Sequence, residues 1–122
     1  MQKALGIGGV FFRAKDPKAL AAWYAEKLGI DTYHPDGRDD AWQQQAGPTV
    51  FAPFARDTDY FGRPDQQVML NFRVADLDAM LKQLRAAGVD VDDEVHEMAG
   101  VGRFGWATDP EGNRFELWEP TA

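Results

Sequence analysis

The chain has 122 residues, of which 44% are hydrophobic and 27% are charged, and this length and mixture fit one folded domain. Its formal net charge of -7 and its scattered Lys and Arg residues argue against nucleic acid, whose phosphates would be repelled. No apolar run approaches the ~20 residues that span a bilayer. Residues 1–12 lack a signal-peptide pattern, and without cysteine the chain has no disulfides or thiolate metal sites. We therefore expect a cytoplasmic protein with no nucleic-acid or membrane partner.

The first half should contain a strand that ends near Arg13 and then a helix. Asp16 is placed to cap this helix, and Pro17 suits its first turn. Apolar residues follow at three- and four-residue spacing and should face the core: Leu20, Trp23, Tyr24 and Leu28. Gly29 should end the helix, because glycine readily adopts the left-handed conformation found there.

Short extended segments follow this helix, and we predict strands at about 31–34, 41–45 and 49–55. A connection from Arg56 to Gln66, rich in Asp, Gly and Pro, then separates the two halves. Aromatic residues lie at and around this connection: Phe51, Phe54, Tyr60 and Phe61. They fit either a loop that closes over a cavity or a surface that contacts a partner chain.

The second half repeats the pattern of strand and helix. Apolar residues alternate with polar ones from Gln67 to Val74, which is the period of a strand with one buried face. Asp76 should cap the next helix and Gly88 should end it. The apolar stripe of this helix comprises Leu77, Met80, Leu81 and Leu84.

Three further strands are predicted after the second helix, at about 89–97, 103–108 and 114–119. The segment DPEGN, Asp109–Asn113, should form a tight hairpin turn between the last two, because Pro110 fixes one dihedral angle and Gly112 permits positive φ. The acidic segment 89–97 is most simply a sheet edge whose carboxylates discourage further pairing; cation binding is the alternative.

A duplicated unit is the simplest explanation of the two halves. Four residues of the first match four of the second at an offset of 60 residues: Phe12, Arg13, Asp16 and Ala19 against Phe72, Arg73, Asp76 and Ala79. We predict one domain over 1–122, with module one at about 5–56, a linker at about 57–66 and module two at about 67–120. Neither half has a large enough core to stand alone.

Three segments resemble the vicinal oxygen chelate superfamily, the glyoxalase, bleomycin resistance protein and dioxygenase-like group: DPKALAAWYAEKLGI, VADLDAMLKQLRAAGV and DPEGNRFELWEP. The resemblance implies an α+β fold in which a duplicated βαβββ module forms a cupped, mostly antiparallel sheet. The superfamily includes lactoylglutathione lyases and metal-free antibiotic-sequestering proteins, so the fold alone does not settle the function. It also implies a homodimer, since drug-sequestering members bind their ligand in grooves between subunits.

In the metal-dependent members, the first and last strands of each module supply the metal ligands. The resemblance maps these positions here to Gly9, Phe51, Met69 and Glu116. Only Glu116 can bind a hard divalent cation, and such sites normally need at least three protein ligands. We therefore expect no metal and no other cofactor. The two histidines, His34 and His96, are expected at the surface or at a sheet edge.

Strand alternation predicts which side chains line the cup. The expected ligand-binding residues are Phe11, Arg13, Trp42, Phe51, Met69, Asn71, Arg73, Arg114 and Trp118. The two matching arginines, Arg13 and Arg73, suit a carboxylate or phosphate of a ligand, or Arg73 instead neutralises Glu116. Glu116 is the candidate catalytic base if its apolar neighbours raise its pKa.

Three functions fit these residues. The first is a metal-independent protein that binds a small molecule in the cup. The second is a lyase or isomerase resembling lactoylglutathione lyase, with Glu116 as its base. The third is a non-catalytic interaction module whose cup is filled by its own side chains.

Overall fold

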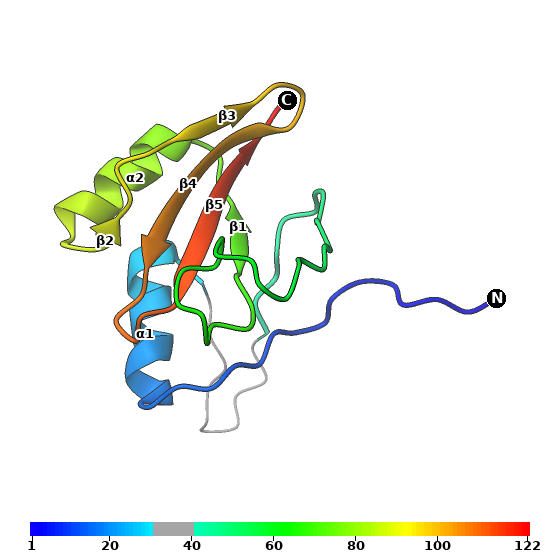
Figure 1. The fold of residues 1–122 in the computed structure, drawn as a ribbon, viewed down its shortest axis with the longest axis horizontal. Helices are drawn as coiled ribbons and strands as arrows, with labels where there is room; N and C mark the ends of the chain where they lie inside the picture. Colours follow the sequence, from blue (N-terminus) through cyan, green and yellow to red (C-terminus); the bar gives the residue numbers. More distant parts are fainter. Residues whose placement is uncertain (31–40) are drawn as a thin grey trace.

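The fold is that of a computed structural model, which describes residues 1–30 and 41–122 (Figure 1). In chain order the elements are α1 (Pro17–Leu28), β1 (Asn71–Arg73), α2 (Leu77–Ala86), β2 (Asp90–Val91), β3 (His96–Met98), β4 (Gly102–Thr108) and β5 (Arg114–Pro120). The predicted α+β class is confirmed, with helices and a single mixed sheet. Neither helix within the described ranges has the length and apolar run needed to cross a membrane.

The sheet is built from the second half of the chain. Its strand order is β1-β5-β4-β2, and β3 also pairs with β4. Strands β4 and β5 form a long antiparallel pair, whereas β1 runs parallel to β5 with Asn71 opposite Glu116. The predicted strand from Gln67 to Val74 is shorter than expected, because only Asn71–Arg73 pairs with β5.

Both helices begin and end where the sequence predicts. The carboxylates of Asp16 and Asp76 each accept a hydrogen bond from the backbone N–H three residues later, at 3.1 and 3.0 Å. Gly29 and Gly88 have φ values of 69° and 79°, the left-handed conformation that ends a helix. These short-range signals act within a few residues, so they operate independently of the rest of the fold.

The predicted hairpin between β4 and β5 is confirmed. Gly112 has a φ of 82°, and its N–H donates to the carbonyl oxygen of Asp109 at 3.0 Å. The buried Asp109 carboxylate accepts from the backbone N–H groups of Glu111 and Asn113, and from the Tyr24 hydroxyl at 2.7 Å. Burial first, and then this hydrogen bond, raises the pKa of Tyr24 above its usual range. The turn is thereby fastened to α1.

One face of the sheet packs against the two helices and forms the core. The buried residues there are Leu20, Tyr24, Leu77, Leu81, Leu84, Ala107, Phe115 and Leu117. Since successive side chains of a strand point to opposite faces, Glu116 and Trp118 lie on the other side of β5. We call this side the open face of the sheet. The loop of residues 56–66, shown in green in Figure 1, lies over it and is called the loop below.

The predicted segment 89–97 forms two short strands instead of one. Strands β2 and β3 both pair antiparallel with β4, at its side remote from β5. Between them the Asp92 N–H still donates to the Trp106 carbonyl oxygen at 2.9 Å, and the chain then turns away from β4. The acidic segment is therefore at a sheet edge, as its charge pattern indicates.

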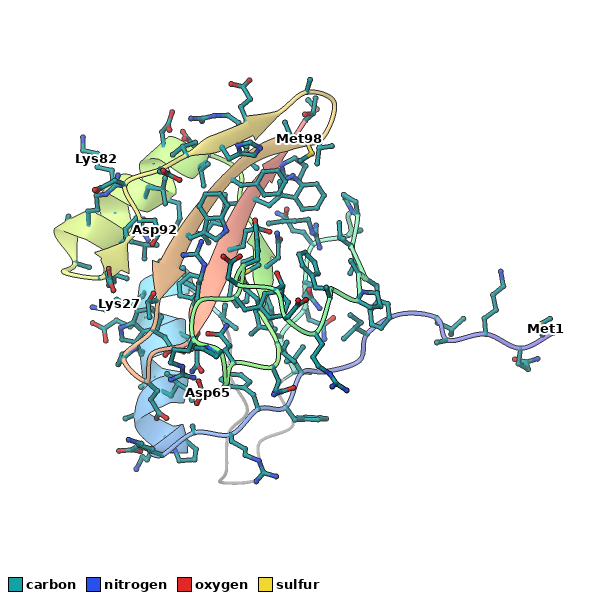
Figure 2. The ribbon with its side chains drawn as sticks, viewed as in Figure 1. Met1, Lys27, Asp65, Lys82, Asp92 and Met98 are labelled. Carbon is teal, nitrogen blue, oxygen red and sulfur yellow. The ribbon has the colours of Figure 1, made fainter. Side chains whose placement is uncertain are left out.

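The strands predicted in the first half are wrong where the structure describes them. Residues 1–16 and 41–70 contain no strand, while the predicted strand at 31–34 lies outside the described residues. The N-terminal segment extends away from the sheet, with Met1 at its far end (Figures 1 and 2), and the residues Phe11 and Phe51 are 97% and 83% exposed. A strand requires a backbone partner, and nothing in residues 1–30 or 41–122 pairs with the outer edge of β1.

Candidate functional site

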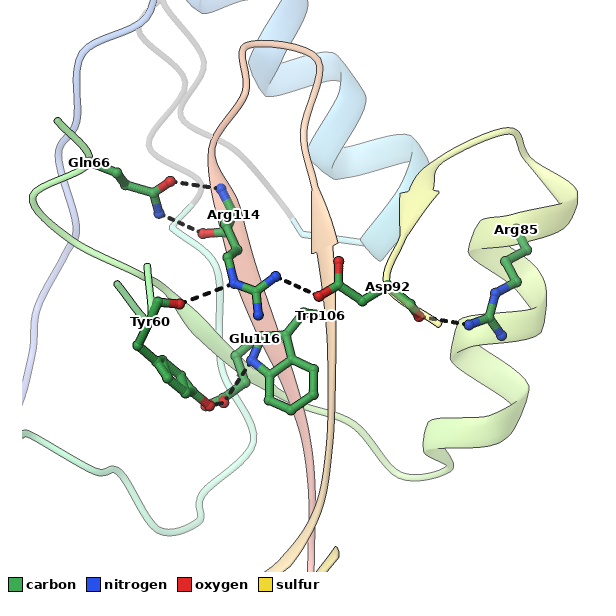
Figure 3. A network of polar contacts seen from close by, with 7 residues as sticks. All are labelled: Tyr60, Gln66, Arg85, Asp92, Trp106, Arg114 and Glu116. Carbon is green, nitrogen blue, oxygen red and sulfur yellow. Dashed lines mark hydrogen bonds and ion pairs between the residues drawn. The ribbon is translucent and has the colours of Figure 1, made fainter. Parts of the chain in front are cut away.

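A single buried carboxylate occupies the middle of the open face. Glu116 is 7% exposed and accepts hydrogen bonds from Trp106 Nε1 at 3.0 Å and from Asn71 Nδ2 at 2.6 Å. The Tyr60 hydroxyl donates to its second oxygen, Oε2, beside Trp106 (Figure 3). The carboxylate is thus satisfied by three neutral donors from β1, β4 and the loop.

Tyr60 keeps its proton at neutral pH. Burial first, and then the hydrogen bond and negative charge of Glu116, raise the pKa of Tyr60 from 10.0 to about 12. The protonated phenol is the form that donates to a carboxylate, so the hydrogen bond itself favours it. Its ring also meets the Trp106 ring edge to face, with centroids 6.2 Å apart.

The loop that carries Tyr60 is fastened to the start of β5. Arg114 Nε donates to the Tyr60 carbonyl oxygen at 3.1 Å. The Gln66 side chain accepts from the Arg114 N–H at 2.9 Å and donates to the Arg114 carbonyl oxygen at 2.7 Å (Figure 3). The Gln66 side chain therefore makes the pair of backbone hydrogen bonds that a neighbouring strand would make. The loop is held to β5 at Tyr60 and at Gln66.

Arg114 belongs to this network of polar contacts. Its Nη1 donates to Asp92 Oδ2 at 2.6 Å, and its guanidinium carbon lies 5.3 Å from the centre of the Trp106 ring. Arg85 Nη2 donates to the Asp92 carbonyl oxygen at 2.9 Å, which joins α2 to the same group (Figure 3). The charge of Arg114 is neutralised by Asp92 and leaves Glu116 without a paired cation among the described side chains.

Of the two alternatives for Arg73, the ion pair with Glu116 is wrong. Arg73 Nη2 donates to the Gln45 carbonyl oxygen at 3.0 Å, and its guanidinium lies against Gly47. The register of β1 and β5 explains this, because Asn71 stands opposite Glu116 whereas Arg73 stands opposite Trp118. Arg73 connects the sheet to the segment after residue 40.

A wide cleft of ≈ 1830 Å³ lies along the unpaired edge of β1, between the sheet and the segments before α1 and after residue 40. Seven of the predicted ligand-binding residues line it: Phe11, Trp42, Phe51, Met69, Asn71, Arg73 and Trp118. Arg13, Arg114 and the candidate base Glu116 are not on its wall. The cleft exceeds the usual small-molecule site of ~300–1,000 Å³, because the segments 1–16 and 41–55 form no strand that pairs with the sheet.

The sequence-based prediction of the open face missed Phe104, Trp106 and the contact of Tyr60 with Glu116. The rings of Phe104 and Trp118 stack with an interplanar angle of 3° and centroids 6.1 Å apart. Phe104 and Trp106 alternate along β4, so the period-two pattern of GRFGWAT was a usable signal for both. No local pattern places Tyr60 on Glu116, because the two are 56 residues apart and Tyr60 lies in a loop.

The side chains in the described part of the chain do not fit a divalent metal ion. Of the four positions implied by the resemblance, Gly9, Phe51 and Met69 offer no oxygen or imidazole ligand, and the Glu116 oxygens already accept three hydrogen bonds. In residues 1–30 and 41–122, no three His, Cys, Asp or Glu side chains converge as a cation site would require. His96 is exposed on β3, and His34 lies outside the described residues.

A strand, a helix and a returning antiparallel sheet, with an acidic residue on the last strand and a cleft beside the first, define a module of the glyoxalase type. Residues 9–118 match the family model of the Glyoxalase-like domain. The chain belongs to this family, and the resemblance noted in the sequence is confirmed.

Solved structures share this fold at low sequence identity. TnmS3, an antibiotic binding protein from Streptomyces sp. CB03234, is 21% identical with a TM-score of 0.58, over 98% of this chain and 100% of that chain. A lactoylglutathione lyase from Agrobacterium tumefaciens is 16% identical with a TM-score of 0.58, over 96% and 95%. A superfamily member from Sphaerobacter thermophilus DSM 20745 is 19% identical with a TM-score of 0.55, over 87% and 90%. No curated protein matches the sequence.

Proposed function

We propose that this protein binds a small molecule in the cleft beside β1, in the cytoplasm and without a metal ion or a nucleic-acid partner. The observation that carries the proposal is the meeting of aromatic, thioether and polar side chains at one wall: Trp118, Met69, Asn71 and Arg73. Apolar walls with a few placed polar groups are typical of ligand sites. The shared fold of TnmS3, described as an antibiotic binding protein, agrees with this function.

The contacts of Glu116 weigh against the lyase or isomerase alternative. A general base must lie within reach of the substrate proton, and Glu116 is buried beneath its hydrogen-bond partners Tyr60, Trp106 and Asn71. Glu116 is also absent from the cleft wall. Likeness to a lactoylglutathione lyase at 16% identity supports the fold and not the reaction.

We also propose that a second copy of the chain completes the cleft. The outer edge of β1 has no strand partner in residues 1–30 and 41–122, and large apolar side chains of the N-terminal segment are exposed, among them Leu5, Ile7, Val10 and Phe11. Exposed apolar surface beside an open sheet edge favours association. A homodimer joined along this edge covers both features.

Ligand binding is tested by thermal shift against amphipathic antibiotics and aromatic metabolites, with EDTA present. Met69→Ala, in the cleft wall, should reduce stabilisation by a ligand found in this way. Met98→Ala is the matched control, because Met98 lies on exposed β3 outside the cleft (Figure 2). Equal loss in both variants, or no stabilising compound at all, contradicts the proposal.

The oligomer is tested by light scattering after size exclusion. We expect twice the mass of the 13.6 kDa chain for the natural protein. Val10→Asp should shift it toward the monomer, because a charge opposes burial of this exposed apolar surface, whereas Lys3→Asp should not. A natural protein that is monomeric at all concentrations rules out the dimer.

A further inference from the structure

We propose that Tyr60 gates a second subsite, in which Glu116 receives an organic cation once the phenol has moved away. This inference rests on the proposed function, because the ligand enters from the cleft. The subsite consists of Glu116, Trp106 and Asn71, and Tyr60 decides whether a ligand reaches the carboxylate.

The first support is electrostatic. Glu116 is 7% exposed, yet its three hydrogen-bond donors are all neutral: an indole, an amide and a phenol. The cation nearest in this network, Arg114, is paired with Asp92 at 2.6 Å. A buried carboxylate normally has a charged partner, so a ligand cation supplies what the fold omits.

The second support is the origin of the three donors. Asn71 and Trp106 lie on paired strands, β1 and β4, where their backbones are fixed by the sheet. Tyr60 lies in the loop, held through its carbonyl oxygen by Arg114 and through Gln66 at the loop's end. The phenol is therefore the donor that a ligand can replace without disturbing the sheet.

The third support is a path from the cleft. Asn71 lines the cleft and also donates to Glu116 Oε1, so its side chain connects the cleft to the subsite. A flat aromatic body in the cleft, with a cationic group extended past Asn71, would bring that group to Glu116. A planar amidinium fits best, since its parallel N–H groups match the two oxygens of a carboxylate.

The experiment follows the indole N–H resonances of the intact protein during titration with benzamidinium, and with neutral benzamide as the matched probe. Trp106 donates to Glu116 and reports the subsite, while Trp118 donates to the Val101 carbonyl oxygen and reports the cleft and the fold. The Trp106 signal is assigned with Trp106→Phe. The variants are Tyr60→Ala, Tyr60→Phe, and Tyr60→Ala combined with Glu116→Gln.

We expect Tyr60→Ala to bind benzamidinium at least about tenfold more tightly than the natural protein at Trp106, which is the effect of removing one competing hydrogen bond to a carboxylate. Tyr60→Phe keeps the ring and should show a smaller gain; it serves if Tyr60→Ala misfolds, which a displaced Trp118 resonance would reveal. Benzamide should bind weakly, and Glu116→Gln should remove the gain.

Equal affinity of the natural protein and both Tyr60 variants, equal binding of benzamide, or a gain that survives Glu116→Gln each overturns the inference. So does a Trp106 resonance that benzamidinium moves in none of the proteins. The proposed ligand binding has a separate readout, because the antibiotic screen reports through Met69 and Trp118.

Discussion

The hydroxyl of Tyr60 donates to the carboxylate of Glu116, and this contact joins a loop to the last strand across 56 residues of sequence. Asn71 and Trp106 complete the same group from β1 and β4. The position that the resemblance assigns to a metal ligand therefore connects four parts of the fold through hydrogen bonds from neutral donors. Its present role is to hold the loop on the open face.

Loss of this hydroxyl should weaken the fold measurably. Tyr60→Phe removes a donor to a buried carboxylate and should lower the free energy of unfolding by about 1–2 kcal/mol. The aromatic contacts with Trp106 and Phe54 remain, so a larger loss is not expected. Urea unfolding of both proteins measures the difference; identical midpoints contradict the assigned hydrogen bond.

The same contact predicts a pH dependence in the alkaline range. The pKa of Tyr60 is raised from 10.0 to about 12 in the folded protein, so the folded state holds this proton more tightly than the unfolded chain. Its contribution to stability is complete below pH 10 and is lost as pH rises toward 12. The difference in stability between natural protein and Tyr60→Phe should shrink over that interval; a constant difference contradicts it. Subtracting the variant removes the contribution of Tyr24.

Arg114 should matter more than an ordinary surface arginine. Arg114→Lys removes the planar guanidinium that contacts Asp92, the Tyr60 carbonyl oxygen and the Trp106 ring at the same time. Because Arg114 is partly exposed, we expect a loss of about 1 kcal/mol in the free energy of unfolding. Arg63→Lys is the control, since its ion pair with Asp65 is more exposed and should contribute less than about 0.5 kcal/mol. Equal losses of stability in urea unfolding would contradict the larger contribution of Arg114.

Gly102 is required by close approach of the backbone. It has a φ of 141°, and a Cβ there would lie 2.2 Å from the Glu119 carbonyl oxygen. Gly102→Ala should therefore destabilise the protein by about 3–5 kcal/mol, through strain and overpacking together. Gly100→Ala, with a φ of 78° and open space around it, should lose only about 1–2 kcal/mol. Thermal unfolding of both variants gives the comparison, and equal losses would contradict the assigned contact.

Local signals in the sequence predicted local structure well. Caps such as Asp16 and Asp76, and the turn at Gly112, depend on a few neighbouring residues and are confirmed. The strands of the first half failed because a strand also needs a partner, and the outer edge of β1 has none in the described chain. Pattern alone cannot supply that second requirement.

The site was also predicted only in part, because some of its contacts depend on residues far apart in the sequence. The alternation of β5 correctly put Glu116 and Trp118 on one face, away from the helices. The pairing of Arg73 with Glu116, one of the two alternatives for Arg73, does not form because the register between β1 and β5 places Asn71 opposite Glu116. Tyr60 was missed as a partner because a loop contact at such separation leaves no periodic trace.

The most direct test of the central claim is to record the indole resonance of Trp118 in metal-free protein during titration with a compound from the thermal-shift screen. Trp118 lines the cleft, and its indole N–H donates a hydrogen bond to the Val101 carbonyl oxygen. Its resonance therefore reports a ligand bound in the cleft. We expect a saturable shift with EDTA present, reduced in Met69→Ala. A Trp118 resonance that moves only after a divalent cation is restored would show that binding depends on a metal.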